Sequence, residues 1–320
     1  MGTQEQMTKS VLLTGGFGNI GGRFAAHLRD LGVEGVKLSS RSNRDSPPWA
    51  PSSRVVKCDL LNPQSLREAV SGTDIIFHFA ALNDRDCIAD PQHAYDVNVI
   101  GTQNLVNAAI ESGVRRIVYM STIHVYGSPL VGHVSESSPT IPTHPYGVTH
   151  LEAERVLTNR SASIESVILR SGNGFGYPMT FGVDIWHIIV NDLCVQAVRE
   201  KRLVLRSPSN IERNFITISD ICSALFHCGF KLNLDRSTDT FNLGSKSSRT
   251  LREMADLVAK CCETRFGYRP PIVESVPETP QLTHLEFDSE KLRSTNFSTQ
   301  EEFEFEIDQM LKVARSHYEK

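Results

Sequence analysis

Three glycines near the start of the chain have a spacing that could hold a phosphate. Gly15, Gly18 and Gly21 follow at three-residue intervals in "TGGFGNIGG", after a short apolar run and before a helical pattern that ends at Gly32. Glycine allows a tight turn and lets backbone N–H groups approach a pyrophosphate at the positive end of a helix. A strand, a glycine turn and a helix in this order predict a dinucleotide site rather than a plain structural turn.

The residues after the second apolar run bear on which dinucleotide would bind. The run ends in "KLSSRSNR", with Ser39, Ser40 and Arg41 in the critical place and Arg44 nearby. An acidic side chain there would bind the ribose hydroxyls of NAD, whereas a basic one suits the 2′-phosphate of NADP. We therefore expect NADP, with NAD as the alternative, unless these are only solvated loop residues. Asp59, after the third run, is the expected contact to the adenine.

A phenol and an imidazole lie one helical turn apart in "HPYGVTHLEAE", residues 144–154. The spacing of Tyr146 and His150 places both side chains on the same side of a helix. A phenol has an ordinary pKa of about 10, so it needs help to exchange protons at neutral pH. An imidazole with a reference pKa of about 6.5 would be mostly neutral there, and we expect it to donate a hydrogen bond without supplying charge.

The elements that would position these residues alternate between two kinds. Short apolar runs without polar alternation are separated by segments with helical periodicity, which predicts a doubly wound parallel α/β sheet of the Rossmann type with helices on both faces. The runs are residues 10–16, 35–40, 53–60, 73–82, 115–122 and 163–172. We expect a dinucleotide-binding domain at 1–172, with returning segments near 213–244, and a smaller α/β lobe, mainly for the substrate, at 173–320.

Composition limits the kinds of partner that the protein could have. The 320 residues are 40% hydrophobic and 22% charged, and the formal net charge is −4 with a pI of about 6.3. This balance favours neither nucleic acid nor a membrane surface. The seven cysteines contain no CxxC pair, which fits neither a disulfide framework nor a zinc site. We expect a cytoplasmic protein without a metal.

Several motifs together resemble one known family. They are "TGGFGNIG", "DLLN", "FHFAAL", "NVIGTQNLVNAA", "STIHVYG", "PYGVTH", "LRSGNGFG", "RNFITISD" and "FNLG". In their order and spacing they resemble the extended short-chain dehydrogenases/reductases, in particular the NAD(P)-dependent sugar-nucleotide epimerases and dehydratases. The resemblance extends over nearly the whole chain.

The resemblance implies catalytic roles for three residues. Thr122 falls where the family's hydroxyl holds the substrate oxygen, and Tyr146 falls where its general acid/base lies. The family has a lysine at the position of His150, where it supplies a fixed positive charge and hydrogen-bonds the nicotinamide ribose. His150 could replace that lysine as a ribose anchor, or it could merely cap or pack on the helix.

Cofactor and substrate contacts follow from the motifs and the resemblance. The cofactor residues are Gly15, Phe17, Gly18, Asn19, Ile20, Gly21, Ser40, Arg41, Asp59, Leu60, Ala80, Ala81 and Asn98. The substrate residues are Asn83, His124, Asn173 and Arg213, with Tyr177 as a further candidate. The resemblance pairs Arg213 with a nucleotide diphosphate, although a salt bridge between lobes is the alternative. His124 and Ile123 replace the Asp-Glu pair of the dehydratases, so we rank 4,6-dehydration low; His124 is an alternative acid/base group or a plain loop histidine.

The resemblance implies an NAD(P)-dependent oxidoreductase that acts on a nucleotide-linked sugar. It would epimerise the sugar through a keto intermediate or reduce a keto-sugar. Two alternatives remain open: a dehydrogenase of another hydroxylated small molecule, such as a sterol or flavonoid, and a non-catalytic NADP-binding sensor. Relatives pair through two long helices, which implies a homodimer through residues 98–112 and 146–157.

Overall fold

The computed structural model describes residues 9–234, 237–278 and 284–318. The chain divides into two compact units. The first unit comprises residues up to 129, 138–171 and 222–242, and the second comprises 130–137, 172–221 and 243 to the end. Each unit is built from segments that lie far apart in the sequence.

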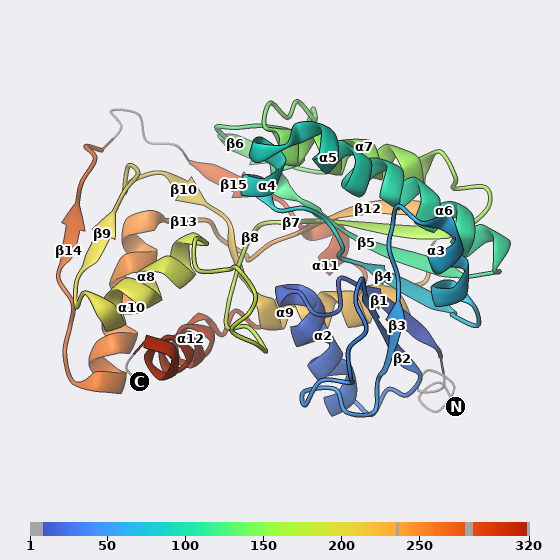
Figure 1. Cartoon of the computed structure of the whole chain (residues 1–320). Coiled ribbons are helices and arrows are strands. Elements are labelled where there is room, and N and C mark those ends of the chain that lie inside the picture. Colours follow the sequence, from blue (N-terminus) through green and yellow to red (C-terminus); the bar gives the residue numbers. More distant parts are fainter. Residues whose placement is uncertain (1–8, 235–236, 279–283, 319–320) are drawn as a thin grey trace. The chain divides into compact units, whose positions relative to one another are not determined.

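A seven-stranded sheet forms the centre of the first unit (Figure 1), in the order β12-β7-β5-β4-β1-β2-β3. The neighbouring strands among β7, β5, β4, β1, β2 and β3 all pair in parallel. The strands are β1 (Val11–Thr14), β2 (Val36–Ser40), β3 (Arg54–Lys57), β4 (Ile75–His78), β5 (Arg116–Thr122), β7 (Glu165–Ser171) and β12 (Thr238–Leu243). The predicted doubly wound Rossmann sheet is confirmed, and the six apolar runs supply six of its strands.

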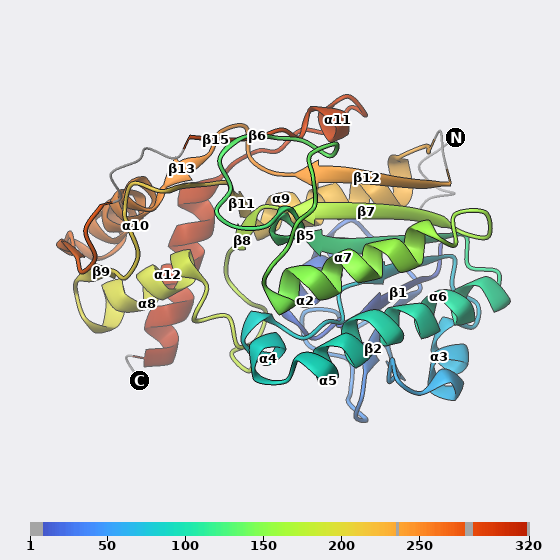
Figure 2. The same ribbon diagram turned by 90° about the horizontal axis from the view of Figure 1, so that it is seen from above.

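Helices pack on both faces of this sheet (Figure 2). On one face, Leu12 of β1 and Ile76 of β4 share a core with Leu105 and Leu157 of the covering helices. On the other face, the Phe77 ring lies 4.6 Å from that of Phe24. The helices are α2 (Asn19–Asp30), α3 (Pro63–Val70), α4 (Asp84–Ala89), α5 (Pro91–Tyr95), η1 (Asp96–Ile100), α6 (Gly101–Glu111), η2 (Ile123–Tyr126), α7 (Pro145–Thr158), α9 (Ile218–Phe226) and η3 (His227–Lys231). Burial on both faces explains why the strands lack polar alternation.

Helix α7 has a clear start signal in the sequence. Pro145 occupies its first turn, where a missing N–H costs nothing, and the His144 side chain accepts a hydrogen bond from the backbone N–H of Tyr146. The helix therefore begins at the residue just before Tyr146. This start fixes which face carries Tyr146, His150 and Glu154, each four residues apart.

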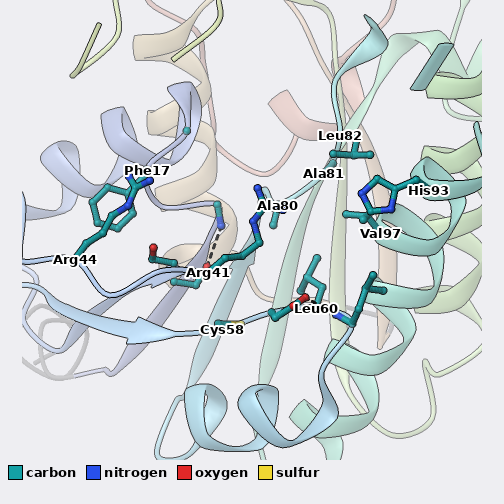
Figure 3. Close-up of a pocket in the computed structure, with 16 residues that line it drawn as sticks. Phe17, Arg41, Arg44, Cys58, Leu60, Ala80, Ala81, Leu82, His93 and Val97 are labelled. Carbon is teal, nitrogen blue, oxygen red and sulfur yellow. Dashed lines mark hydrogen bonds between the residues drawn. The ribbon is translucent and has the colours of Figure 1, made fainter. Parts of the chain in front are cut away.

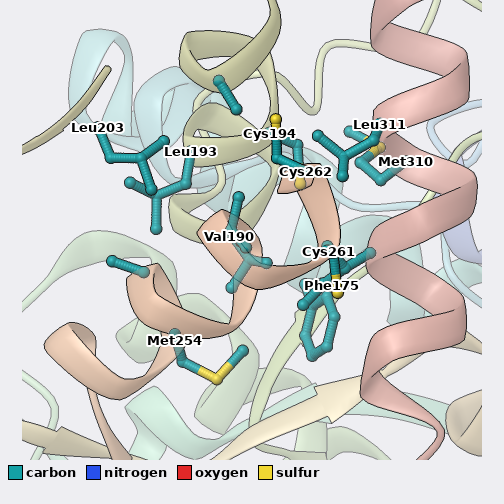
Figure 4. Packing of buried hydrophobic residues seen from close by; sticks show 14 of the residues in the cluster. Phe175, Val190, Leu193, Cys194, Leu203, Met254, Cys261, Cys262, Met310 and Leu311 are labelled. Carbon is teal, nitrogen blue, oxygen red and sulfur yellow. The ribbon is translucent and has the colours of Figure 1, made fainter. Parts of the chain in front are cut away.

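The second unit has short strand pairs around a helical core. Figure 4 shows apolar side chains of three helices packed together, among them Leu193, Met254 and Leu311. The helices are α8 (Ile189–Arg199), α10 (Leu251–Phe266), α11 (Glu290–Arg293) and α12 (Phe303–Tyr318). The strands are β6 (Gly132–Val134), β8 (Asn173–Phe175), β9 (Leu203–Leu205), β10 (Glu212–Arg213), β11 (Phe215–Thr217), β13 (Arg249–Thr250), β14 (Ile272–Glu274) and β15 (Leu285–Phe287).

The cysteines are part of the packing. All seven are buried and free. Within the described ranges, no three His, Cys, Asp or Glu side chains come together as metal ligands would. The same ranges contain no helix with the length and apolar character needed to cross a membrane.

Candidate active site

A cavity of about 390 Å³ lies at the carboxyl ends of four parallel strands of the first unit. This edge is where open α/β sheets bind ligands. Predicted cofactor residues that line it are Gly15, Phe17, Gly18, Ser40, Arg41, Asp59, Leu60, Ala80 and Ala81. Residues that line it without having been predicted are Cys58, Leu61, Leu82, His93 and Val97. Figure 3 shows Phe17 and Arg44 on one side of the cavity and His93 and Val97 on the other.

The glycine loop fits a pyrophosphate because no side chain could replace two of its glycines. Gly15 has a φ of +67°, and a Cβ there would lie 2.9 Å from the backbone nitrogen of Ala80. A Cβ on Gly21 would lie 2.3 Å from the Gly15 oxygen. Gly18 precedes α2, whose first turn receives no side-chain cap. Backbone N–H groups at the positive end of α2 therefore remain available to an anion. Predicted contacts Asn19 and Ile20 belong to this first turn.

The β2 end of the cavity is rich in hydroxyl and guanidinium groups. Ser39 accepts a hydrogen bond from the Gly15 N–H at 3.2 Å, which ties the strand end to the glycine loop. Arg41 also lines the cavity, and the Arg44 guanidinium lies 5.0 Å above the centre of the Phe17 ring. Of the described residues around the cavity, only Asp59 carries a carboxylate, and its Oδ1 accepts from the Leu61 N–H. The charge at this end suits a phosphate.

An uncharged hydrogen-bond network runs beneath the cavity. Thr14 accepts from the Phe79 N–H and lies 2.6 Å from Nδ1 of His78, whose Nε2 lies 2.9 Å from Thr102. Thr102 donates to the Asn98 carbonyl at 2.6 Å. Burial lowers the pKa of His78 to about 3. The imidazole is therefore neutral at physiological pH. It connects Thr14 to Thr102 by hydrogen bonds without carrying a charge.

Asn98 connects the cavity to α7. Its Oδ1 accepts from the backbone N–H of Leu82 at 2.8 Å, and its Nδ2 donates to Thr149 Oγ1 at 3.0 Å. Thr149 donates in turn to the carbonyl of Tyr146 at 3.1 Å. Asn98 is fully buried and does not line the cavity itself. This predicted cofactor residue instead holds the backbone of Leu82, which lines the cavity. A chain of hydrogen bonds thus links the cavity wall to the helix that carries Tyr146.

The structure places the side chains of Thr122 and Tyr146 close together. Thr122 ends β5 and caps η2. Burial, with a smaller contribution from the Asp84 carboxylate, raises the pKa of the Tyr146 phenol to about 12, and the nearby Thr122 hydroxyl opposes this shift. The phenol is therefore protonated at neutral pH and can donate its proton.

His150 packs against Tyr146. The two ring centroids lie 4.2 Å apart, and His150 Nδ1 lies 2.9 Å from the backbone oxygen of Tyr146. Burial lowers the pKa of His150 to about 4, with the bond to the Tyr146 carbonyl opposing the shift and the nearby His124 adding to it. The expected neutral imidazole is therefore present. No positive charge from His150 reaches the phenol.

His124 and Asn83 differ in how they face the site. His124 is exposed, and its ring centroid lies 6.1 Å from that of Tyr146 in an edge-on arrangement. Asn83 caps α4, because its Oδ1 accepts from the Asp86 N–H at 2.9 Å. Asn83 therefore has a structural task that its place in the sequence did not reveal.

Three predicted substrate residues belong to the second unit. Asn173 donates from Nδ2 to the Asn214 carbonyl at 3.1 Å, next to Arg213. Arg213 is half-buried, burial lowers its pKa, and none of the described acidic side chains forms an ion pair with it. A guanidinium of this kind is suited to an external anion. The Tyr177 ring packs against the apolar core of this unit.

Comparisons with known proteins agree on one family. The family model described as "NAD dependent epimerase/dehydratase family" matches residues 11–244. A UDP-glucose 4-epimerase of Streptomyces lividans is 33% identical over 161 residues, so the chain spans about half the length of this relative (49% of each chain). One of Halalkalibacterium halodurans is 27% identical and covers 78% of this chain and 79% of its own. The Thermus thermophilus UDP-glucose 4-epimerase, solved with NAD, has a TM-score of 0.78 at 23% identity over 96% of this chain and 99% of its own.

Proposed function

The chain belongs to the NAD dependent epimerase/dehydratase family, and within this family we propose that it uses NADPH to reduce a keto group of a nucleotide-linked sugar. The observation that carries the proposal is the state of Tyr146. Tyr146 is partly exposed, its phenol packs against an uncharged imidazole, and its pKa is raised to about 12. Such a group is protonated at neutral pH, and it can pass its proton to the alkoxide that ketone reduction creates, because an alkoxide is the stronger base.

The protonation state of Tyr146 is our reason for proposing reduction. Reduction of a ketone needs a proton for the new alkoxide, which a phenol at Tyr146 supplies directly. Oxidation of an alcohol needs the phenolate. With a pKa of about 12 for Tyr146, the phenolate fraction at pH 7 is only on the order of 10⁻⁵. An epimerase that oxidises and then reduces its sugar would need both states, so reduction is the better match.

The cavity residues match NADP. Bound there, a nicotinamide dinucleotide supplies the hydride. The N–H groups at the start of α2 would hold its pyrophosphate, with Asp59 and Leu60 beside the adenine. Arg41 and Arg44 would bind the 2′-phosphate, which favours NADP over NAD.

The substrate contacts are also a proposal. Thr122 would hold the reacting oxygen while Tyr146 delivers its proton, and His124 would contact the sugar from the exposed side. Arg213, with Asn173 beside it, would bind the diphosphate through its guanidinium fork. The second unit would then be the main substrate-binding lobe. A UDP-linked sugar is the first substrate to test, because the named relatives are UDP-glucose 4-epimerases.

We further propose a homodimer in the cytoplasm. Large apolar side chains are exposed on the helices over one face of the sheet, namely Ile88, Tyr95, Ile100 and Val148. Exposed apolar groups gathered on neighbouring helices are typical of an interface between subunits. A reducing compartment would keep the seven free thiols reduced.

The function is tested by supplying each direction with its own substrates. Purified protein is given NADPH with a UDP-4-keto-6-deoxy sugar, and separately UDP-glucose with NAD. We expect oxidation of NADPH at 340 nm that depends on the keto-sugar, and little change in UDP-glucose. Conversion of UDP-glucose to its 4-epimer without added NADPH would instead identify an epimerase. Tight NADP binding without turnover of any keto-sugar would favour the sensor.

A further inference from the structure

A second cavity lies in the first unit, at the other ends of α2 and β2. Its volume is about 450 Å³, and small-molecule sites range from roughly 300 to 1,000 Å³. The cavity proposed for NADP meets the start of α2 and the end of β2, whereas this one meets the last turns of α2, the start of β2 and the turn before β3. None of its described lining residues belongs to the site predicted from the sequence.

The second cavity is apolar inside and polar at its rim. Its inner wall consists of small apolar side chains, each at most 8% exposed, namely Ala25, Val33, Val36 and Ala50. Charged and hydroxyl groups lie at the rim, where Arg29, Glu34 and Ser52 are exposed. Such a wall accepts an apolar body, and a few polar groups at the rim fix its orientation.

Arg29 at this rim already has its partners within the protein. Its Nε and Nη2 donate to Asp30 Oδ1 at 2.8 and 2.6 Å, and its Nη1 donates to the backbone oxygen of Trp49 at 2.8 Å. Asp30 supplies the counter-charge. The guanidinium therefore does not require an anion in the second cavity.

Glu34 leaves the second cavity with an unmatched negative charge. Its carboxylate lines the cavity and forms no ion pair with any basic side chain that the structure describes. Helix α2 ends at Asp30, so the negative end of its dipole lies beside the same space. Both features attract a cation.

We propose that the second cavity is a ligand site for a small organic cation with an apolar body, such as a protonated amine. The apolar part would lie against Ala25 and Ala50, and the ammonium group would donate to the Glu34 carboxylate. The site lies outside the cavity proposed for NADP, so its occupation does not depend on the proposed function.

Trp49 contacts residues of both cavities and can report binding. Its backbone oxygen accepts from Arg29 of the second cavity, and its ring lies 6.3 Å from that of Phe17, which lines the first. Ala50, the next residue, lines the second cavity. The chain has two tryptophans, so Trp186→Phe leaves Trp49 as the only one. Its emission then responds to a ligand beside Ala50.

Three probes that share a phenyl ring on a short arm test the class of ligand. Trp49 emission of the Trp186→Phe protein is titrated at pH 7 with protonated 2-phenylethylamine, neutral 2-phenylethanol and anionic 3-phenylpropanoate. We expect a saturable change with the amine, about fivefold weaker binding of the alcohol, as for the loss of an exposed ion pair, and the weakest binding of the carboxylate. No saturable change with the amine, or equal affinity for all three probes, would overturn the proposal.

Glu34→Gln and Glu111→Gln form a matched pair. Both variants remove one exposed carboxylate of the first unit, but only Glu34 lines the second cavity. Glu34→Gln should weaken binding of the amine about fivefold and leave that of the alcohol unchanged, whereas Glu111→Gln should leave both unchanged. Equal losses from the two variants would show that the amine responds only to the net charge of the protein, which would defeat the contact with Glu34.

A bulky side chain at the rim tests where the probes bind. Ser52 is exposed and lines the second cavity, so Ser52→Phe obstructs the opening without disturbing the core. The amine and the alcohol should both bind at least about tenfold more weakly. Ser42→Phe is the control, because Ser42 is exposed in the same loop but does not line this cavity. Unchanged or tighter binding by Ser52→Phe would place the probes elsewhere and reject the site.

Discussion

Arg170 and Glu154 form a buried ion pair beneath the candidate acid/base group, with 2.6 Å between Nη2 and Oε2. Glu154 lies two helical turns after Tyr146, and its Oε1 accepts from Ser121 Oγ at 2.5 Å. Ser121 directly precedes Thr122 on β5. Glu154 therefore fastens α7 to β5 and β7. This holds Tyr146 and Thr122 at a fixed separation.

We predict that Glu154→Gln destabilises the protein strongly. It leaves the Arg170 guanidinium buried without its counter-charge, which costs about 3–5 kcal/mol. Glu152→Gln is the control, because Glu152 forms an exposed ion pair with Arg155 one turn away and should cost less than about 1 kcal/mol. Urea denaturation measures both. Equal losses from the two variants would show that the buried pair does not support α7.

Replacement of the phenol tests the chemistry itself. Tyr146→Phe should lower the rate of keto-sugar reduction by about 10²–10⁴-fold, as for the loss of a general acid. The affinity for NADP⁺ should change little, because Tyr146 is not among the residues that line the cavity. Tyr119→Phe is the matched control: its buried hydroxyl has no partner among the described residues, so its removal should preserve the rate. An unchanged rate in Tyr146→Phe would exclude Tyr146 as the acid.

Cofactor preference tests the basic end of the cavity. NADP⁺ should bind at least about tenfold more tightly than NAD⁺, because Arg41 and Arg44 lie where a 2′-phosphate would meet them. Arg41→Asp should move the preference toward NAD⁺. Arg67→Asp, on the exposed surface of α3, makes the same change of charge away from the cavity and should leave the ratio unchanged. Calorimetric titration decides, and tighter binding of NAD⁺ to the native protein would show that the arginines do not select the cofactor.

The two directions of the reaction should respond differently to pH. Reduction uses the phenol of Tyr146, whose pKa of about 12 leaves it protonated, so its rate should stay constant between pH 6 and 9. Oxidation of the product uses the phenolate and should rise about tenfold per pH unit over the same range. His150→Lys should bring a cation near the phenol, lower its pKa and speed oxidation near neutrality. If oxidation by the native protein is independent of pH, Tyr146 is not the group that titrates.

The fold and the family could be predicted because their signals are local. The strands are buried on both faces and therefore read as apolar runs, and the match over residues 11–244 confirms the family that the motifs indicated. The predicted membership of the NAD-dependent epimerases and dehydratases is thereby confirmed. Nine of the residues predicted to bind a cofactor line the cavity, because glycine loops and strand ends can be recognised from local sequence patterns.

The missed residues depend on packing that the sequence does not encode locally. His93 and Val97 line the cavity because α5 and η1 turn one face toward it, and only their spacing of four residues hinted at a shared face. Asn83 looked like a pocket residue but caps α4. The orientation of the His150 ring depends on the backbone carbonyl of Tyr146, one turn earlier, to which its Nδ1 is hydrogen-bonded. No residue pattern could have revealed its orientation.

The two buried histidines should make the protein less stable in mild acid. Burial lowers the pKa of His78 to about 3 and that of His150 to about 4. Above pH 6.5 both are neutral in the folded and the unfolded chain and have no effect. As the pH falls from 6.5 toward 4, the unfolded chain takes up protons that the folded chain cannot, so the free energy of unfolding must fall. Each group contributes up to about 1.4 kcal/mol per pH unit in this window.

A difference between variants isolates this effect from the carboxylates, which also respond to acid. The free energy of unfolding is measured by urea denaturation at pH 7.0, 6.0 and 5.0 for the native protein and His150→Gln. His150→Gln is less stable at pH 7 because it loses packing on Tyr146, but it should lose about 1 kcal/mol less between pH 6 and 5. Parallel curves for the two proteins would mean that His150 takes up its proton in the folded state and is not held neutral by burial.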